Sequence, residues 1–437
     1  MNQITNSDFN AVLVDGARIP FLKSGTDYND LMAYDLGRMA IKGLLARNDL
    51  NPSDIDRVIM GTVIQEVKTS NVARESALGA GIPNSVPAHT TTMACISSNM
   101  AITSGMDLIR SGQAKIILAG GTETMSDIPV RFKKKFRQKV LEARKYRSPL
   151  DFLKFLKGLG FKDLMPELPA ISEFSTGETM GQSADRMAAR FGVSRNDQDE
   201  FAMRSHHLAA KATKEGLLED ELLPASVPPK FKVVHQDNGF RKDTSMEKLA
   251  KLRPAFIKPH GTVTAGNASF LTDGASASLI MEEQTALSLG FKPKAYLRSY
   301  TYVSQDPGEE LLLGPAYASP KVLDAMNLSL DDIDVFEIHE AFAGQVLAVM
   351  NALDSDEFAR NSLKREKKVG RIPMEKTNTL GGSLSLGHPF GATGVRLVTT
   401  AANRLIREDG KYALVTACAA GGQGHAIVLE RYSNVSS

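Results

Sequence analysis

The chain has 437 residues, more than one hydrophobic core usually supports, so we expect two domains or two related halves. Its 42% hydrophobic and 23% charged residues exclude global disorder, and no stretch reaches the roughly 18 apolar residues that a membrane-spanning helix needs. A net charge of +2 argues against a nucleic-acid partner, and two cysteines are too few for a disulfide framework.

Short β-rich runs alternate with helical patterns along most of the chain. Alternation of this kind is typical of an α/β fold, in which helices cover the faces of sheets. The spacing of apolar residues predicts helices at 31–46, 100–110 and 395–407. It predicts strands at 11–14, 57–60, 115–118, 278–281, 335–338, 412–416 and 425–429.

Two pairs of segments recur in the same order along the chain. Residues 50–56 and 328–334 both end in Asp-Ile-Asp and lead into a predicted strand. Cys95, followed by a helix and a strand, is matched by His388, also followed by a helix and a strand. These pairs indicate a duplicated α/β half, with polar residues at strand ends, where open α/β sheets bind ligands. We therefore divide the chain into a first half (1–129 with 252–292), an insert (130–251) and a second half (293–437).

The first cysteine, Cys95, stands in Thr91–Met100, immediately before a helical pattern. A thiol at a helix N-terminus meets unpaired N–H donors and the positive end of the helix dipole, which both favour the thiolate. The same donors can stabilise an oxyanion on a carbonyl group under attack. Cys95 is therefore a candidate nucleophile, and the alternative is a small buried core residue.

The segment Gly387–Gly394 contains His388, and its Pro389 fits the first position of a helix. Most isolated histidines are structural, but one held between glycine and proline at a helix start favours a functional role. Neutral imidazole can accept a thiol proton near neutral pH. We therefore expect His388 to act as a base.

Two further candidates end predicted strands of the second half. Cys418 precedes a glycine-rich turn, so we expect it on the ligand face rather than sealed in the core, as an acid or base. His339, with Glu340, follows the strand at 335–338 and can orient a substrate carbonyl or a water molecule. A plain strand cap is the alternative for His339.

These motifs belong to a longer series that matches one family in order. The chain resembles the thiolase family, in particular the 3-ketoacyl-CoA thiolases of fatty-acid β-oxidation complexes. His339 stands where most thiolases carry asparagine. Thr179 stands where short-chain biosynthetic members often carry histidine. Both differences favour a degradative enzyme. The other matching strings are Asp15–Pro20, Gly120–Ser126, Met180–Gly181, Arg253–Phe256, Thr262–Ser269 and Asp273–Ala275.

The resemblance implies a thiolase-like α/β fold. Two duplicated βαβαβαββ halves would form a five-layer α-β-α-β-α arrangement, and an inserted loop domain would extend from it. It also implies an enzyme, an acyltransferase that cleaves 3-ketoacyl-CoA with CoA through an acyl-cysteine intermediate. Cys95 would be the nucleophile, activated by His388, with Cys418 as acid and base and His339 assisting. Ser269 and Met180 would line the channel for CoA.

The resemblance implies no metal and no redox cofactor, because CoA enters as a substrate. It implies a homodimer and an α subunit with hydratase and dehydrogenase activities as partner in a heterotetramer. Two alternatives stay open: a condensing enzyme, either a ketosynthase or one that synthesises acetoacetyl-CoA, and a CoA- or lipid-binding scaffold. Cys418 argues against a ketosynthase, since an enzyme that forms its carbanion by decarboxylation needs no second thiol.

A basic segment interrupts this series. Between Arg131 and Asp163 the sequence holds 12 Lys and Arg residues against three acidic ones, interleaved with apolar residues at helical spacing. We keep three interpretations of this segment. It could be a solvated helical insertion that covers the active site, or it could bind the phosphates of CoA. It could also dock to a partner subunit or to an anionic membrane, the latter giving peripheral membrane contact through 131–162. Residues 1–10 carry no targeting pattern, so we expect a cytoplasmic protein.

Overall fold

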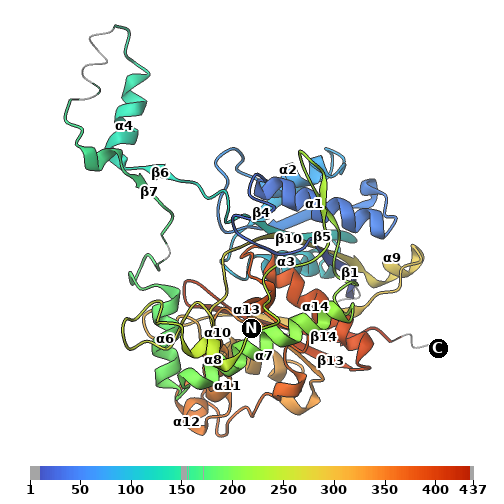
Figure 1. Cartoon of the computed structure of the whole chain (residues 1–437). Coiled ribbons are helices and arrows are strands. Elements are labelled where there is room, and N and C mark those ends of the chain that lie inside the picture. The colour runs from blue at the N-terminus through green and yellow to red at the C-terminus, as the bar shows by residue number, and fades with distance from the viewer. Residues whose placement is uncertain (1–9, 149–154, 156, 171, 434–437) are drawn as a thin grey trace.

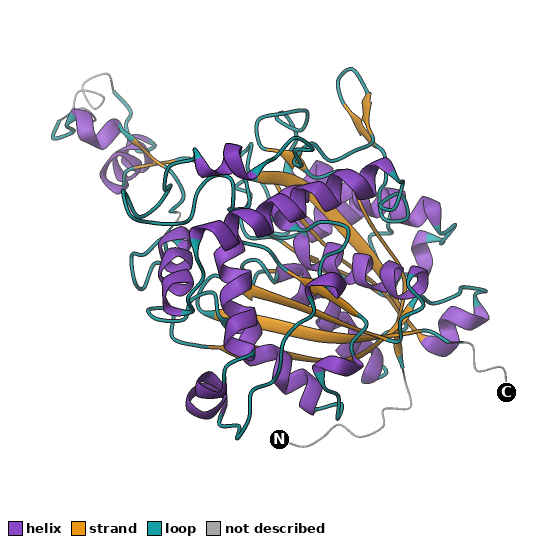
Figure 2. Ribbon diagram, turned by 60° about the horizontal axis from the view of Figure 1, so that its bottom comes forward, coloured by secondary structure: helices purple, strands orange, loops and turns teal. Residues whose placement is uncertain are grey.

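A ten-stranded mixed sheet runs through the molecule in the computed structural model, which describes residues 10–148, 155, 157–170 and 172–433 (Figures 1 and 2). The hydrogen-bonded order is β12-β13-β14-β11-β1-β10-β5-β3-β4, and β2 pairs with β10. The first half supplies β1 (Ala11–Arg18), β2 (Leu22–Lys23), β3 (Arg57–Gly61), β4 (Ala88–Thr91), β5 (Ile116–Glu123) and β10 (Thr272–Glu282). The second half supplies β11 (Ala295–Ser304), β12 (Val335–Ile338), β13 (Tyr412–Ala419) and β14 (Gln423–Arg431).

The strand pairing of the two halves is alike. In the first half β3 lies parallel to β4 and β5, and β5 lies antiparallel to β10. In the second half β12 lies parallel to β13, which lies antiparallel to β14. The halves join where Val12 and Leu13 of β1 pair with Tyr296 and Ala295 of β11.

Helices form three layers around these strands, which confirms the five-layer arrangement. Helices α1 (Ala33–Arg47) and α2 (Val72–Gly79) share a core with one face of the first half. Helices α3 (Ser97–Arg110) and α14 (Thr393–Arg407) pack together between the halves and share a core with strands of both. Figure 1 shows the second half, in orange and red, below the blue first half. Its outer face is covered by α6 (Met180–Arg190), α10 (Gly314–Asp324) and α11 (Ala343–Leu353).

The duplication extends to individual hydrogen bonds. Asp56 precedes β3, and its carboxylate accepts the backbone N–H groups of Lys115 and Ile116 at 2.7 and 2.9 Å. Asp334 precedes β12 and accepts the N–H groups at the start of β13 in the same way, at 2.6 and 3.3 Å. The two Asp-Ile-Asp strings of the sequence thus serve one purpose, which is to fix the start of the neighbouring parallel strand.

The predicted elements are present, with one correction near His388. Each of the three predicted helices and seven predicted strands overlaps an observed element, with residues 31–32 and 115 falling outside, although β4, β11 and the shorter helices carried no clear pattern. Helix α14 begins at Thr393, so Pro389 lies in a turn and not at the first helical position. The turn hydrogen bonds from Ala392 and Thr393 to the Pro389 carbonyl take the place of a helix start.

The segment between β5 and β10 makes a projection and then a long return over the body. In the projection β6 pairs with β7, and α4 lies beyond this stem, apart from both halves in Figure 1. No described helix is long and apolar enough to cross a membrane. The projection holds β6 (Arg131–Phe132), α4 (Lys134–Ala143), the 3₁₀ turn Phe161–Leu164 and β7 (Pro166–Glu167), and the return holds α6, α7 (Arg195–Lys214), β8 (Ala225–Val227), β9 (Lys232–Val234) and α8 (Met246–Ala250).

The return is tied to the first half by a buried ion cluster. The Arg18 guanidinium donates to Glu221 at 2.7 Å and to both oxygens of Asp237 at 2.6 and 2.9 Å, and all three side chains are buried. This cluster gives the Asp15–Pro20 string a structural role. The remaining elements are α9 (Glu283–Ser288), α12 (Asp356–Phe358), α13 (Ser383–Leu386), the π-helical turn Ala359–Leu363 and the 3₁₀ turns Pro52–Asp54, Leu330–Asp332 and Met374–Lys376.

Candidate active site

Cys95 lies in a tight turn that leads into the central helix α3. Ala94 adopts a left-handed conformation with φ of 46°, which a non-glycine residue rarely takes, so the surrounding contacts have to hold it. The Ser97 hydroxyl does so, because it accepts the N–H of Met93 at 2.8 Å and donates to the Ala94 carbonyl at 2.7 Å. The turn leaves the half-buried Cys95 thiol in front of α3.

His388 lies in the turn that precedes the second central helix, α14. Gly387 before it has φ of 111°, a conformation that favours glycine, and a Cβ atom there would meet Thr272 Cγ2 at 2.7 Å. The His388 N–H donates to Thr272 Oγ1 at 3.0 Å, and its ring Nδ1 lies 2.7 Å from Thr393 Oγ1. Only 3% of the His388 surface is exposed.

His339 directly follows β12, and its backbone N–H continues the parallel ladder to the Thr416 carbonyl at 2.9 Å. Its ring is fully buried, with Nδ1 at 2.9 Å from Ser383 Oγ. The ring centroids of His339 and His388 are 4.1 Å apart. The strand end of the duplicated unit therefore brings a second imidazole against the first.

The buried Glu340 organises the turn opposite His339. Its carboxylate accepts the Asn378 amide at 2.7 Å, the Ser205 hydroxyl at 2.8 Å and the Leu384 N–H at 3.2 Å. A Cβ atom on Gly382 would lie 2.1 Å from the Glu340 carboxyl carbon, so only glycine fits there. This packing fixes the start of α13, where Ser383 is the first residue.

Three reactive groups meet at this point. The Cys95 sulfur and one nitrogen each of His339 and His388 lie within 4.8 Å of one another. Since Nδ1 of each ring is engaged elsewhere, Nε2 is the free nitrogen of each, and neither Nε2 has a partner among the described residues. The backbone N–H of Ala420, in the glycine-rich turn after Cys418, faces the Cys95 sulfur.

Cys418 corrects one expectation. It is fully buried, not exposed on a ligand face, because β13 continues through Ala419 and pairs Cys418 with Gly424 of β14. It is nevertheless close enough to Cys95 for a charge on Cys95 to raise the pKa of its thiol. Both sulfurs thus lie in one region, with Cys95 on the accessible side.

Burial sets the protonation of these groups. It raises the pKa of the Cys95 thiol to about 12 and that of Cys418 well above its usual range. It lowers the pKa of His388 to about 3 and that of His339 well below its usual value, with the Arg396 charge adding to both. Burial therefore outweighs the expected effect of the helix N-terminus on Cys95: at rest the thiols are protonated and the imidazoles neutral.

The two expected CoA contacts, Ser269 and Met180, lie in different places relative to this cluster. The Ser269 N–H donates to the Ala341 carbonyl at 3.0 Å, two residues beyond His339. Met180 begins α6 and packs against the core of the second half. Their contact with CoA stays a prediction.

A thiol and two imidazoles at this separation suit a soft cation as well, so the expectation of no metal also stays a prediction.

Sequence reasoning missed the residues that hold the two imidazoles. Thr393 lies in the Gly387–Gly394 string around His388, which was a usable signal, and Ser383 lies just before that string, after Gly382. Arg396 lies in the predicted helix at 395–407, and nothing in the pattern indicated that its side chain is fully buried beside the two rings.

Comparison with known proteins gives a consistent result. The "Thiolase, N-terminal domain" family matches residues 11–284, and the "Thiolase, C-terminal domain" family matches residues 291–431. The mitochondrial trifunctional enzyme subunit beta of Homo sapiens is 61% identical over 423 residues, which cover 97% of this chain and 89% of that protein. A 3-ketoacyl-CoA thiolase of Photorhabdus laumondii is 44% identical over 430 residues, or 98% of this chain and 99% of that protein.

Solved structures agree with the sequence comparison. The crystal structure of human mitochondrial 3-ketoacyl-CoA thiolase matches with a TM-score of 0.84 at 32% identity, covering 97% of this chain and 99% of that one. The same human enzyme in complex with CoA matches with a TM-score of 0.83. From its two family domains, its relatives and its fold, the chain belongs to the thiolase family.

Proposed function

We propose that this chain is a 3-ketoacyl-CoA thiolase, an acyltransferase that uses CoA to split a 3-ketoacyl-CoA into acetyl-CoA and a shortened acyl-CoA. The observation that carries the proposal is the meeting of the Cys95 thiol with two neutral imidazoles within 4.8 Å. The identities of 44% and 61% to the bacterial thiolase and the human trifunctional enzyme subunit support the same substrate class and a role in the last step of fatty-acid β-oxidation.

The first step is attack of the Cys95 sulfur on the C3 carbonyl. Because the thiol is protonated at rest, its proton leaves during attack, and Nε2 of His388 accepts it. His388 is arranged for this role. The Thr393 hydroxyl donates to the Pro389 carbonyl at 3.0 Å, so its oxygen accepts Nδ1–H of His388 and the lone pair lies on Nε2.

The second step breaks the bond between C2 and C3. The acyl group stays on Cys95 as a thioester, and the electron pair leaves with acetyl-CoA as an enolate. Cys418 donates its proton to C2 of the enolate, since burial keeps its thiol protonated until a strong base forms. The Ala420 N–H beside Cys95 is a donor for the oxyanion of the tetrahedral intermediate.

The third step returns the enzyme to its starting state. Incoming CoA gives its thiol proton to the Cys418 thiolate and attacks the acyl-Cys95 thioester. The shortened acyl-CoA leaves, and Cys95 recovers its proton from His388. No step needs an oxidant, a reductant or a metal, so CoA is the only co-substrate.

A condensing enzyme is the second candidate, because Cys95, His388 and His339 form the Cys-His-His set that decarboxylative condensation uses. The proximity of Cys418 to Cys95 favours the thiolase, since that reaction needs a second acid and base at the enolate carbon. A binding scaffold is disfavoured by the free thiol and the two unpartnered Nε2 atoms.

The test follows the Mg²⁺-enolate absorbance of a 3-ketoacyl-CoA after addition of CoA. We expect rapid loss of absorbance with the wild type and none with Cys95→Ser. Mass spectrometry of protein incubated with acyl-CoA should place one acyl group on Cys95. A label that persists in Cys95→Ser, or no turnover at any chain length, contradicts the proposal.

The partner expected from the relatives is an α subunit, because the human and other mammalian relatives are named as beta subunits of a trifunctional enzyme. We propose a hydratase and dehydrogenase subunit in a heterotetramer around a homodimer of this chain. The outer edge of β4 supports the homodimer. Among the described strands no other pairs with that edge, whereas residues 377–378 cover the outer edge of β12.

The projection is the proposed contact with an anionic membrane surface or the partner subunit. Helix α4 has no buried residue, and Phe132, Leu141 and Phe161 are 50, 60 and 81% exposed beside its basic side chains. Its position apart from both halves gives no support to a role in covering the active site or in holding the phosphates of CoA (Figure 1).

A cytoplasmic location is also proposed. The human relative is named as mitochondrial, so an organelle is the alternative location. Fractionation of cells that express the chain at its natural level is the measurement, and recovery in an organelle or envelope fraction contradicts it.

A further inference from the structure

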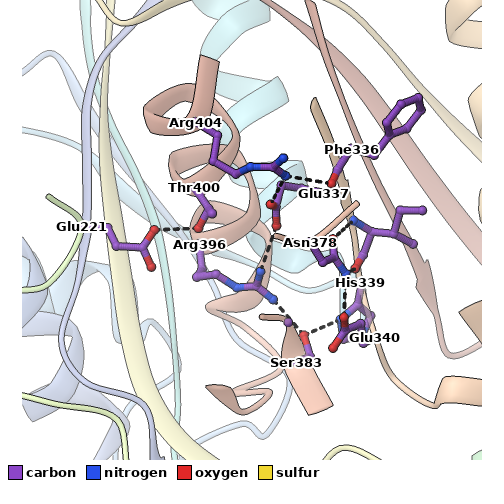
Figure 3. A network of polar contacts seen from close by, with 12 residues as sticks. Glu221, Phe336, Glu337, His339, Glu340, Asn378, Ser383, Arg396, Thr400 and Arg404 are labelled. Atoms are coloured by element: carbon purple, nitrogen blue, oxygen red, sulfur yellow. Dashed lines mark hydrogen bonds and ion pairs between the residues drawn. The ribbon is translucent and has the colours of Figure 1, made fainter. Parts of the chain in front are cut away.

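The Ser383 hydroxyl connects the active-site ring of His339 with the buried guanidinium of Arg396. Ser383 Oγ lies 2.9 Å from His339 Nδ1 and accepts a hydrogen bond from Arg396 Nη2 at 2.9 Å (Figure 3). These are its only hydrogen-bond partners within the described part of the chain. All three side chains are buried, so no bulk water competes for these positions.

The direction of each bond follows from the chemistry of the groups. Guanidinium has donors and no acceptor, so Arg396 occupies a lone pair of the Ser383 oxygen. The single hydroxyl proton is left to donate, and His339 Nδ1 is the acceptor within reach. If Nδ1 instead carried a proton and donated it, the hydroxyl proton would be buried without an acceptor.

This direction determines where the ring of His339 carries its own proton. The ring is neutral, because burial and the nearby charge of Arg396 hold its pKa well below the usual value. A neutral imidazole has one N–H, and since Nδ1 accepts, the proton lies on Nε2. Nε2 is the nitrogen without a partner, so the N–H is free to donate to a substrate.

Arg396 is itself fixed by the charges packed around it. Its Nη1 lies 3.5 Å from Glu337 Oε2, and the other oxygen of Glu337 accepts Arg404 Nη1 at 2.9 Å. Glu337 belongs to β12, the strand that His339 directly follows, and both arginines belong to α14 (Figure 3). The guanidinium therefore cannot turn away from Ser383 without leaving a buried charge unpaired.

We propose that Ser383 and Arg396 are positioning residues that hold His339 as its Nε2–H tautomer, so that His339 donates a hydrogen bond to the substrate carbonyl oxygen and does not act as a base. This inference rests on the proposed function. It gives the adjacent imidazoles opposite roles, since His388 presents a lone pair at Nε2 and His339 presents an N–H.

The first test reads the tautomer directly. Wild-type protein labelled with ¹⁵N at histidine is compared with His339→Asn to assign the ring signals of His339, and a long-range ¹H–¹⁵N spectrum separates protonated from bare nitrogens. We expect a protonated Nε2 and a bare Nδ1 for His339 across pH 6–8. A proton on Nδ1 in the wild type overturns the proposal.

The second test is a double-mutant cycle on turnover. Ser383→Ala should lower kcat by about tenfold or more, short of the roughly 10²–10³-fold loss on removing an oxyanion donor, with KM nearly unchanged. In the His339→Asn background, which keeps an amide donor but has no tautomer to set, Ser383→Ala should change kcat by less than about twofold. An equal loss in both backgrounds assigns Ser383 a structural role and overturns the proposal.

Ser385→Ala is the matched control. Ser385 is an equally buried serine of α13, but its hydroxyl bonds to Ser205 and Gly382 and has no contact with His339. It should leave the His339 nitrogen signals unchanged. Absence of 3-ketoacyl-CoA cleavage by the wild type would refute the proposed function alone, because the nitrogen spectra decide the tautomer without turnover.

Discussion

Glu123 and Gly391, 268 residues apart, are joined by a hydrogen bond of 2.9 Å from the Gly391 N–H to the Glu123 carboxylate. The same carboxylate accepts the N–H groups of Val63 and Ile64 at 3.0 and 2.9 Å. Glu123 ends β5 of the first half, and Gly391 lies three residues after His388. A buried carboxylate thus ties the loop of the base to the half that carries the nucleophile.

This carboxylate makes stability depend on pH. Burial raises the pKa of Glu123 from 4.5 to about 7, against the opposing effect of its N–H donors. The folded chain therefore holds a proton between pH 4.5 and 7 that the unfolded chain releases, so stability falls as pH rises through this window. Between pH 4.5 and 7.5 we expect the free energy of unfolding of the wild type to fall by on the order of 3 kcal/mol relative to that of Glu123→Gln.

Urea denaturation of both proteins at a series of pH values measures this difference. Glu337, whose pKa burial also raises to about 7, titrates in both proteins and cancels in the comparison. A difference that stays flat with pH would contradict the assignment to Glu123.

Cys418→Ser should separate the two parts of the reaction. Without the thiol, protonation at the enolate carbon loses its acid, so cleavage of the carbon–carbon bond should slow by about 10²–10⁴-fold. Transfer of an acyl group from acyl-CoA to Cys95 forms no carbanion and should fall much less. Quenched-flow mass spectrometry follows the second rate and the enolate assay the first. Equal losses in both would argue against an acid at this position.

Gly387→Ala should damage both folding and catalysis. The new Cβ would lie 2.7 Å from Thr272 Cγ2 in a conformation that favours glycine, and Thr272 holds the His388 N–H. We expect a loss of about 2 kcal/mol or more in unfolding free energy and at least tenfold in kcat. Gly290→Ala is the control, because Gly290 also has a positive φ but no atom within 4 Å of the new Cβ. It should cost about 1 kcal/mol and leave kcat unchanged, and similar kcat values for both variants would refute the effect on His388.

Asp237→Ala should strongly destabilise the fold. It leaves the Arg18 guanidinium buried with half of its charge partners and removes the acceptor of the Phe21 N–H at 2.7 Å. Breaking a buried pair in this way costs about 3–5 kcal/mol. Asp243→Ala removes a carboxylate that is 74% exposed and pairs with Lys248, and it should have little effect on the midpoint of urea denaturation. Comparable midpoints would contradict the role given to the Arg18 cluster.

Reversal of charge on the projection should affect association and not turnover. Lys134, Arg137 and Lys145 are exposed basic residues of the projection, and their replacement by Glu should reduce sedimentation with vesicles that contain anionic lipid. The same charge change at Arg360, Lys364 and Lys367, exposed on the second half, is the control. Vesicle binding that is unchanged, together with loss of the α subunit on copurification, would assign the projection to the protein partner.

The sequence was a good guide to the elements and to the identity of the reactive side chains. Cys95 and His388 stand just before predicted helices and His339 follows a predicted strand, positions that the local sequence indicates, and the three residues meet as expected. The prediction that Cys418 is exposed was wrong. The β13–β14 pairing continues past the cysteine, and its length depends on partner strands that the local string does not encode. The prediction of a Cys95 thiolate was wrong for a related reason. The effect of a helix N-terminus can be inferred from the local sequence, whereas burial, which raises the thiol pKa, is set by the whole fold.

The residues that orient the imidazoles were beyond sequence reasoning. Ser383 and His339 are 44 positions apart and meet only because Glu340 and Gly382 pack the two turns together. Arg396 reads as an ordinary helix arginine until α14 is placed between two halves, where its surroundings are other charges of the core.

The twin aspartates Asp56 and Asp334 show how closely the copies still match, yet the residues before the paired central helices have diverged. One copy places a sulfur before its central helix and the other an imidazole. Two identical copies would have carried two nucleophiles or two bases at these positions. The two copies therefore divide the chemistry between them, and a half paired with itself would bring together two sulfurs or two imidazoles instead of one of each.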